Sequence, residues 1–541
     1  MILLALACAD PVVPAHPLAD PGARLVRASL LVRGHRPSAT ELAEFRAAPY
    51  TLPDRIDAWM AEPTFGANVR DALNEWWRTR VTHRNLLPML GPLEGVDRGA
   101  VATSLGEAPL IFAEQVVLEG RPFTDVLTTT GAWVDPHVAA VFGLEHDPAG
   151  PLWQAPNPGS RPVAGILSVD PLWFRHITGD ANAQRSRAEF VYDRLLCDGL
   201  TDLPLPIGDL SPASNAVATE PACTGCHDVL DPAAANFFGW RRYALQNEVT
   251  QAYLNACADP TYCYPLAWYE PEDTTGWSEA GLPPPGFEHL PTKDLATFAS
   301  AVATDPRFLA CTARRLRGWL TQTDPLTLPS AVVDADVATL NAHGNRLDAL
   351  WKSIVLEPAV TGTDAPGPLL VRPEALARSV EFFTGFRWHI DPNPQGCTLL
   401  GCSREVDVFN DDLWGQRTLA GGQDGWDVLD PVHAPTATRL LARERLAFKA
   451  ADHLVTTDFA LPAEERVLLT LVEPSTHGTA KVKEQIAHLH SRWLGLPFDP
   501  DSEEVAADVD LWVEVAGHAS NTEAWRAVVA ARLADPTVEL F

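Results

Sequence analysis

The chain has 541 residues, more than one hydrophobic core normally organises, so we expect two or three domains. Hydrophobic residues make up 46% and charged residues 21%, an ordinary globular composition that excludes wholesale disorder. With 41 Lys and Arg against 70 Asp and Glu, the net charge of −29 argues against binding to nucleic acid or to anionic lipid surfaces. This surplus of acidic residues is compatible with a soluble protein in an exposed compartment, and it would also attract a basic partner.

The first residues, MILLALACAD, resemble the end of a lipoprotein signal peptide, because small and apolar residues lead into Cys8. No positive residues precede the run, and Ala5 stands where Leu is usual; a start site further upstream would account for both. We predict a signal or lipoprotein-like segment and linker over residues 1–22, with Cys8 as the candidate lipid anchor. The run is too short to span a bilayer, and no later segment is predicted to be transmembrane.

Most later segments have the period of amphipathic helices. The first, SATELAEFRAA, begins with Ser38 as N-cap and Glu41 three residues later, which predicts a capping box. Strand signals are few and short. The predicted fold class is therefore mainly α, a multidomain helical protein with few strands and long Pro-rich loops, especially at 201–222 and 258–292.

A short pattern recurs at four helix ends: an acidic residue, Pro, and a hydrophobic residue two positions further, in AEPTF, TDPRF, LEPAV and ADPTV. Pro is expected to stop each helix, and the hydrophobic residue to fold back against it. RGHRPSATELAEF and LGLPFDPDSEEV also share a Gly and Pro turn before an acidic helix. We interpret this as one helical module used near both ends, although common helix-stop chemistry gives the same pattern. A boundary in TQTDPLTLPSAVV separates a helical domain, 23–325, from a C-terminal helical domain, 326–541, with a partial repeat of the module.

The stretch EPACTGCHDVLDP carries the strongest chemical signal. In a haem attachment motif, two thiols such as Cys223 and Cys226 add to the vinyl groups, and the adjacent His227 lies beneath the iron as axial ligand. A thioredoxin-like dithiol would need a βαβ context, and a zinc site would need two more ligands at short spacing. A structural disulfide or chance are further alternatives. The spacing favours covalent haem c.

The surroundings add a resemblance. The stretch ILSVDPLWFRHITGDANAQRSRAEFVYDRLLCDGL is followed by a Pro-rich loop, by CTGCHDVLDP and by DLATFASAVATDPRFLACTARRLRGWL. This order resembles the planctomycete-type cytochrome c family of exported proteins, in which Leu-Leu-Cys, a Pro-rich loop, the haem motif with Asp-Pro, and a helix with Asp-Pro-x-Phe and Cys follow one another. The resemblance covers about residues 25–330 well and the remainder loosely.

The resemblance implies an exported, mostly α-helical protein that carries haem c, and it implies no particular reaction. Carried over position by position, the cofactor-binding residues are Cys223, Cys226, His227, Asp231 and Pro232. Two stretches depart from the family pattern. AAANFF follows Asp-Pro where Gly and Phe are usual, and AQRSRAE replaces a Ser-Pro and Arg-Gly segment. These departures concern the surroundings of the haem more than its attachment.

The other face of the iron has several candidate ligands. All three Met residues precede the motif, and Met60 and Met89 lie in apolar helical settings that are typical of core. His176, in LWFRHIT, lies in the segment that matches the family, beside Trp173 and Phe174. It is the preferred second ligand to the metal, besides His227, and His137 is a weaker candidate. An open or water-filled position remains an alternative.

The nine cysteines fit an exported protein if Cys8 carries lipid and the motif carries haem, because six are then left to pair. CADPTYC and CTLLGC close small loops, which suggests disulfides Cys257–Cys263 and Cys397–Cys402. That leaves Cys197 and Cys311, which either pair over a long loop or stay buried free thiols.

Taken together, the sequence predicts an exported c-type cytochrome with one covalent haem that exchanges electrons with a redox partner protein. We expect it in the periplasm or, as a lipoprotein, at the outer membrane or cell surface. One alternative is a haem enzyme with an open distal site, peroxidase-like or oxygenase-like. The other is a haem-free cell-surface structural or binding protein, which the large acidic C-terminal part favours. No Ser-His-Asp order, Gly-rich phosphate loop or HExxH motif is present.

Overall fold

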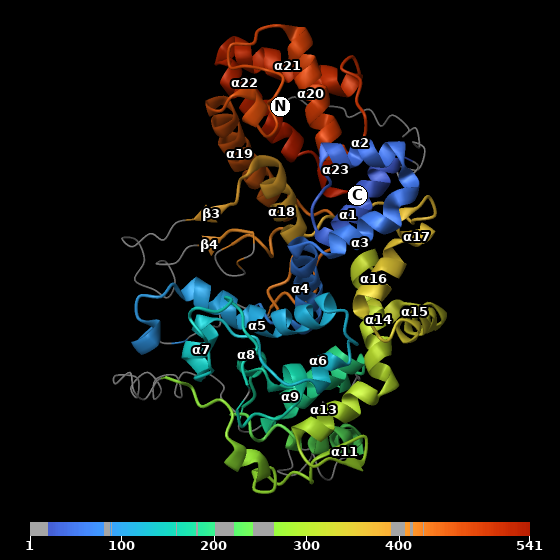
Figure 1. Cartoon of the computed structure of the whole chain (residues 1–541), viewed down its shortest axis with the longest axis vertical. Coiled ribbons are helices and arrows are strands. Elements are labelled where there is room, and N and C mark those ends of the chain that lie inside the picture. The colour runs from blue at the N-terminus through green and yellow to red at the C-terminus, as the bar shows by residue number, and fades with distance from the viewer. Residues whose placement is uncertain are drawn as a thin grey trace.

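The computed structural model describes residues 20–80, 87, 89–157, 159–179, 182–200, 221–241, 264–390, 406–409, 411, 415–425 and 427–541. This part of the chain is mainly α-helical, as predicted. Its strands form two short antiparallel pairs, which are β1 (Gly286–Phe287) with β2 (Leu290–Pro291) and β3 (His389–Ile390) with β4 (Val406–Asp407). Figure 1 shows an elongated molecule with the last helices at one end and the haem-motif helix, α11, at the other.

The first helices lie in the middle of the molecule (Figure 1). They are α1 (Pro21–Arg33), α2 (Ala39–Ala47), α3 (Leu52–Met60) and α4 (Pro63–Trp77). The predicted capping box is present, because the Ser38 hydroxyl accepts from the Glu41 amide at 3.2 Å and the Glu41 carboxylate accepts from the Ser38 amide at 2.7 Å. α1 is buried on almost every side because α2, α3, α4, α16 and α17 pack around it.

The next helices form the end of the molecule that carries the haem motif. They are α5 (Arg98–Leu118), α6 (Asp125–Thr128), α7 (Pro136–Phe142), α8 (Asp170–Arg175), α9 (Arg185–Phe190) with a π-helical turn (Val191–Leu195), α11 (Pro221–Ala235), α13 (Leu295–Thr304) and α14 (Pro306–Thr321). Within the described residues, α5 is the one helix long and apolar enough to cross a membrane, and sequence analysis did not flag it. Of its most apolar window 78% is buried inside the fold, and no second such helix occurs in the described part of the chain.

The remaining helices lead back through the middle and build the other end. They are α15 (Ser330–Ala342), α16 (Leu347–Val355), α17 (Pro358–Thr361), α18 (Pro373–Thr384), α19 (Ala437–Ala460), α20 (Thr479–Leu494), α21 (Glu503–His518), α22 (Asn521–Leu533) and α23 (Pro536–Glu539). α22 packs against both α19 and α21, and α20 packs against α21. These contacts bury an apolar face on each helix and hold the C-terminal helices together as a bundle.

All four acid-Pro junctions end a helix, as predicted. The structure adds that the same Pro begins the next helix, since α4, α14, α17 and α23 each start at the Pro of the pattern. Proline is well suited to this position because its missing amide would have no partner in the first turn. The hydrophobic residue that follows is buried in every case: Phe65, Phe308, Val360 and Val538.

The two copies of the predicted module share their local structure. α1 and α20 both end at a glycine in the left-handed conformation, Gly34 with φ 67° and Gly495 with φ 70°. In each copy a serine then caps the following helix, Ser38 for α2 and Ser502 for α21. A residue with a side chain at either glycine would be strained by the positive φ. The shared sequence pattern therefore corresponds to shared turn and cap geometry.

Segments on both sides of the predicted boundary near residue 326 belong to one core. The Trp351 indole of α16 donates to the Leu31 carbonyl of α1 at 3.1 Å. The buried Arg27 guanidinium donates to the carbonyls of Gly367 at 2.7 Å and Phe541 at 3.2 Å. The division into 23–325 and 326–541 stays a prediction, but the first helix packs with the last residues of the chain.

Candidate functional site

The haem motif begins helix α11, which packs against α9 and β1. Cys223 and Cys226 lie one turn apart and are both half-buried free thiols, not joined to each other. His227 follows directly and keeps 22% of its side chain exposed. The two predicted attachment residues and the predicted axial ligand therefore lie at the partly exposed start of one helix.

The imidazole of His227 is held in place by two residues. Its Nδ1 lies 2.8 Å from Asp231 Oδ1, one turn further along α11. Arg185 of α9 donates two hydrogen bonds to the same carboxylate, from Nε to Oδ1 at 2.6 Å and from a terminal nitrogen to Oδ2 at 2.9 Å. Burial alone would raise the pKa of Asp231, but the bonds from Arg185 and His227 lower it below its usual value. Asp231 is thus ionised and directs the Nδ1 proton of His227 toward itself, which leaves Nε2 free to bind.

Pro232 lies inside α11, where it removes one helical hydrogen bond. Its carbonyl accepts from the Asn236 side chain at 3.1 Å. It also packs against Gly286 of β1, where an added Cβ would come within 3.3 Å of the proline ring. Its role in this structure is to pack α11 against β1.

The residues at the start of α11 fit a covalently bound haem. A haem needs two free thiols and one oriented imidazole nitrogen, and α11 offers these together. Within the described residues, no three His, Cys, Asp or Glu side chains converge as metal ligands, so a zinc site would need ligands from elsewhere. The same part of the chain has only two-residue antiparallel strands around α11, unlike the βαβ setting of a dithiol enzyme.

His176, the preferred second ligand, lies at the C-terminal end of α8 and contacts residues of α4 and α9. Its Nε2 lies 2.8 Å from the carbonyl oxygen of Trp77 at the end of α4, and its ring packs on Phe190 at 4.5 Å. Burial, and then the charge of Arg175, lower the pKa of His176 well below its usual value, so it is neutral. To bind iron, His176 would have to use Nδ1 or give up the bond to Trp77. Its role as second ligand stays a prediction.

The other predicted residues near the haem also have partners. Met60 and Met89 are partly buried against the core, as their apolar settings suggested. Trp173 is fully buried among Phe190, Phe237 and Trp240, so it belongs to an aromatic core.

Among the predicted cysteine pairs, Cys197 and Cys311 form a disulfide that joins the end of the π-helical turn to α14 across 114 residues. Cys8, as well as the predicted pairs Cys257–Cys263 and Cys397–Cys402, lies outside the described residues. The confirmed disulfide lies beside the elements that hold α11, because α9 leads into Cys197 and also packs against α11.

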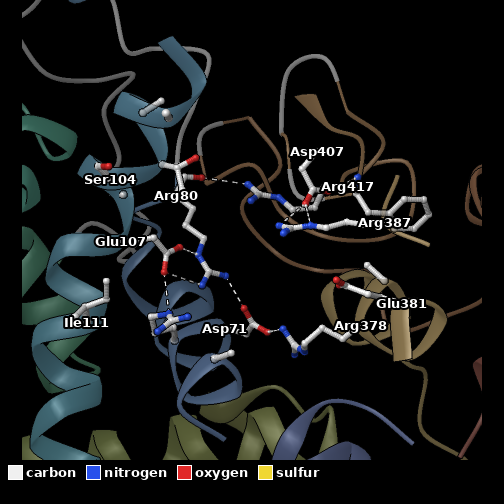
Figure 2. Close-up of a pocket in the computed structure, with 18 of the residues that line it drawn as sticks. Asp71, Arg80, Ser104, Glu107, Ile111, Arg378, Glu381, Arg387, Asp407 and Arg417 are labelled. Atoms are coloured by element: carbon white, nitrogen blue, oxygen red, sulfur yellow. Dashed lines mark hydrogen bonds and ion pairs between the residues drawn. The ribbon is translucent and has the colours of Figure 1, made fainter. Parts of the chain in front are cut away.

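A second site was not predicted. A cavity of about 680 Å³ separates α4 and α5 from α18, the loop that follows it, and β4. Figure 2 shows charged side chains that point into it from both sides. Five arginines line the cavity, which are Arg70, Arg80, Arg378, Arg387 and Arg417. Five carboxylates line it as well, which are Asp71, Glu107, Asp135, Glu381 and Asp407.

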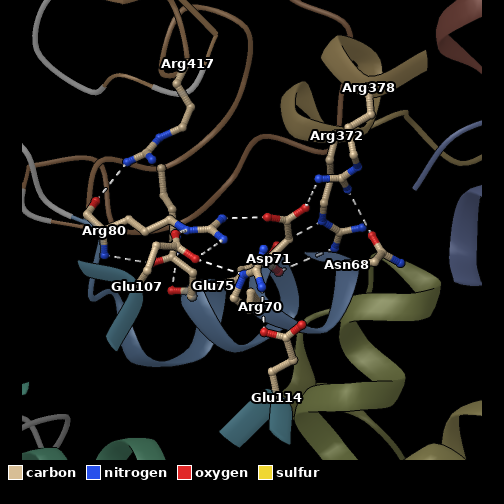
Figure 3. Close-up of polar contacts among 12 residues, drawn as sticks. Asn68, Arg70, Asp71, Glu75, Arg80, Glu107, Glu114, Arg372, Arg378 and Arg417 are labelled. Atoms are coloured by element: carbon tan, nitrogen blue, oxygen red, sulfur yellow. Dashed lines mark hydrogen bonds and ion pairs between the residues drawn. The ribbon is translucent and has the colours of Figure 1, made fainter. Parts of the chain in front are cut away.

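A network of ion pairs forms the floor of this cavity (Figure 3). Asp71 bridges the two sides, since it binds Arg80 of the α4 side at 2.5 Å and Arg378 of α18 at 2.6 Å. Burial alone would raise the pKa of Asp71, but these two arginines lower it below its usual value. Arg80 and Arg70 also share Glu107, at 2.9 Å from Arg70. The floor is therefore a fixed network of paired charges.

A serine, an aspartate and a histidine meet at one margin of the cavity. Ser104 donates to the Asp135 carboxylate, and His137 Nδ1 lies 3.0 Å from the same hydroxyl. The bond to Asp135 raises the pKa of His137. In a catalytic triad the imidazole uses Nε2 toward serine and Nδ1 toward aspartate, whereas here Nδ1 faces both residues. His137 thus serves the cavity wall, and this geometry does not activate Ser104 as a nucleophile.

Comparisons with protein-family models, curated proteins and solved structures found no significant match for this chain. The resemblance to the planctomycete-type cytochromes rests on the motifs alone and stays a prediction.

Sequence reasoning missed Arg185 and the whole cavity. Arg185 lies in AQRSRAE, the stretch noted only as a departure from the family pattern, and 46 residues separate it from Asp231. No local pattern marks such a pair. The cavity residues come from helices and loops far apart in the chain, and no spacing rule connects them.

Proposed function

We propose that this chain is an exported c-type cytochrome that carries one haem, attached at Cys223 and Cys226, and exchanges electrons with a partner protein. The observation that carries the proposal is the chain of hydrogen bonds that links His227 to Asp231 and Asp231 to Arg185. A proximal histidine commonly donates its second ring nitrogen to a carboxylate or carbonyl, which fixes its orientation and increases its basicity.

When bound, the haem would supply one-electron chemistry at its iron. His227 would present Nε2 to that iron, and Asp231 would hold the proton on Nδ1. Arg185 would keep Asp231 ionised and in position at its half-buried site. The two thiols would fix the cofactor against the start of α11, so that the chain loses no haem when the iron changes its oxidation state.

Two further features support export and a protein partner. The Cys197–Cys311 disulfide is typical of proteins that fold in an oxidising compartment. The net charge of −29 would speed association with a partner that has a basic docking surface.

The test is a pyridine haemochrome spectrum of the full chain, produced in a host with cytochrome c maturation. We expect a c-type α-band in the parent and none in the Cys223→Ala, Cys226→Ala double variant. Thr224→Ala, which changes one of the two residues between the thiols, should keep the band. A folded parent without haem would overturn the proposal.

A second candidate is a haem enzyme with an open sixth position, and the position of His176 favours it. His176 is bound to the Trp77 carbonyl, and Met60 and Met89 are packed against the core. If the sixth position is open, cyanide will shift the Soret band of the ferric protein at micromolar concentrations, and peroxide will be consumed. A spectrum that does not change with cyanide would leave electron transfer as the function.

A further inference from the structure

The cavity between α4–α5 and α18–β4 is not used by the proposed cytochrome, whose attachment residues all lie on α11. Its volume of about 680 Å³ is within the range of small-molecule sites. Both walls contribute charged and aromatic side chains, which a space left over from imperfect packing would not gather.

The charges of the arginines and carboxylates in the cavity cancel. Its five arginines face five carboxylates, and most of them form ion pairs, including Arg80 with Asp71 at 2.5 Å and Arg387 with Asp407 at 3.1 Å. A phosphate or carboxylate ligand would therefore have to displace a carboxylate that is already bound. The surplus of acidic residues in the chain would also repel such an anion. An uncharged ligand meets neither obstacle.

Two half-exposed tryptophans lie on opposite walls of the cavity. In the described part of the chain most tryptophans are buried, and the half-buried ones are Trp133, Trp153, Trp277 and Trp388. Trp153 stands beside Gln154, which pairs with Val134 just before α7, whereas Trp388 follows α18 and packs against Phe409 at 6.2 Å. Aromatic surface left open in a cavity is a loss for folding, and it is typical of surface that receives a ligand.

These features together select one ligand chemistry. A wholly apolar ligand would cover the paired charges without replacing the water bound to them, which is unfavourable. A sugar ring has an apolar C–H face that packs on an aromatic ring. Its neighbouring hydroxyls match the two oxygens of a carboxylate or the two nitrogens of a guanidinium, both of which are planar two-point groups.

We propose that this cavity binds an uncharged carbohydrate, with Trp153 and Trp388 against the sugar faces and the arginine–carboxylate pairs on the hydroxyls. The site is separate from α11 and does not require haem. The chain would thus combine a redox cofactor at one end with a site for a neutral glycan between α4–α5 and α18–β4.

The test is a binding titration of the full chain, followed by tryptophan fluorescence and calorimetry. The probes are β-1,4-linked hexasaccharides of glucose, mannose, xylose and N-acetylglucosamine, the α-1,4-linked glucose hexamer, and the galacturonic acid hexamer as an anionic comparison. We expect at least one neutral hexamer to bind, with an affinity that is the same in 50 mM and 500 mM NaCl. Trp153→Ala and Trp388→Ala should each weaken it about tenfold.

Trp277→Ala is the matched control, since it removes a half-buried tryptophan outside the cavity, and it should bind as the parent does. The Cys223→Ala, Cys226→Ala variant should also bind unchanged, so that failure of the cytochrome proposal leaves this one intact. Thermal unfolding of each variant shows that a loss of binding is not a loss of fold. The proposal is overturned if no neutral hexamer binds, if binding survives both cavity substitutions, or if only the galacturonic acid hexamer binds.

Discussion

The haem-motif helix and the cavity are built in opposite ways. The first is a local site, in which five residues of α11 between Cys223 and Pro232 provide the attachment, the ligand and its support. The second is assembled from α4, α5, α7, α18 and the loops after them, and its charges are fixed only when these elements meet. The local site can be changed with little effect on the fold, whereas the cavity floor is part of what holds the fold together.

The largest effect is expected at the cavity floor. Asp71→Ala would leave Arg80 and Arg378 without their shared buried carboxylate. Removal of one partner from a buried ion pair usually lowers the free energy of unfolding by about 3–5 kcal/mol. Urea denaturation of the two proteins measures the loss.

Two comparisons make this prediction specific. Glu484→Ala removes an exposed ion pair with Lys481 on α20 and should lower the free energy of unfolding by less than about 0.5 kcal/mol. The Cys223→Ala, Cys226→Ala variant without haem should unfold close to the haem-free parent. If Asp71→Ala lowered the free energy of unfolding no more than these two variants do, the ion pairs of the cavity floor would not stabilise the fold.

The disulfide provides the second test, because it lies on the haem side of the molecule. Cys197→Ser with Cys311→Ser opens a loop of 114 residues, and loss of such a crosslink typically lowers the free energy of unfolding by about 2–5 kcal/mol. Urea denaturation with and without a reductant should show the parent losing more stability on reduction than the variant, in which only the predicted pairs Cys257–Cys263 and Cys397–Cys402 are left to reduce. A parent indifferent to reductant would show that stability on this side depends on packing alone.

The contrast also explains what could be predicted from sequence. Ser38 with Glu41, the four acid-Pro junctions and the haem motif are local patterns, and the expected caps and helix ends are present because the relevant bonds form within a few residues. Arg185 with Asp231, and Asp71 with Arg80 and Arg378, depend on how helices pack. The length and hydropathy of a helix such as α5 do not distinguish a buried core helix from one that spans a membrane. Local patterns in the sequence do not indicate which helix faces which.

A third prediction concerns His176, which connects the two regions because it binds the end of α4 from within the segment that resembles the cytochrome family. Its pKa is lowered by burial first and by Arg175 next, so the folded protein keeps it neutral. The unfolded chain takes up the proton below about pH 6.5, so this contribution to stability is full above that pH and lost as the pH falls.

In His176→Gln, the amide can still donate to the Trp77 carbonyl but does not titrate. Between pH 6.5 and 5.5 the parent should lose about 1 kcal/mol more unfolding free energy than the variant, measured by urea denaturation at each pH. Above pH 7.5 the two pH profiles should run parallel. If the unfolding free energies of the parent and the variant change equally with pH over the whole range, His176 takes up its proton in the folded state as well. Its surroundings would then tolerate a charged imidazole.

The smallest effect is expected behind the haem itself, and it tests whether the local site is as independent as its construction suggests. Asp231→Asn keeps the shape of the group that accepts from His227 but removes its charge. The imidazole then gives less electron density to the iron, so the reduction potential should rise by on the order of tens of millivolts while the haem stays attached. A redox titration monitored at the α-band measures the shift.

Asp228→Asn is the matched control, since it removes a carboxylate from an exposed position on the same helix, next to His227. It changes the local charge equally but breaks no bond to the imidazole, so its shift should be clearly smaller. If the two variants shift the potential alike, the series from His227 to Arg185 acts only through its net charge. If Asp231→Asn alone shifts it, the orientation and basicity of His227 are set by a residue that α9 holds from 46 positions away. The local site would then share with the cavity a dependence on helix packing that its motif does not reveal.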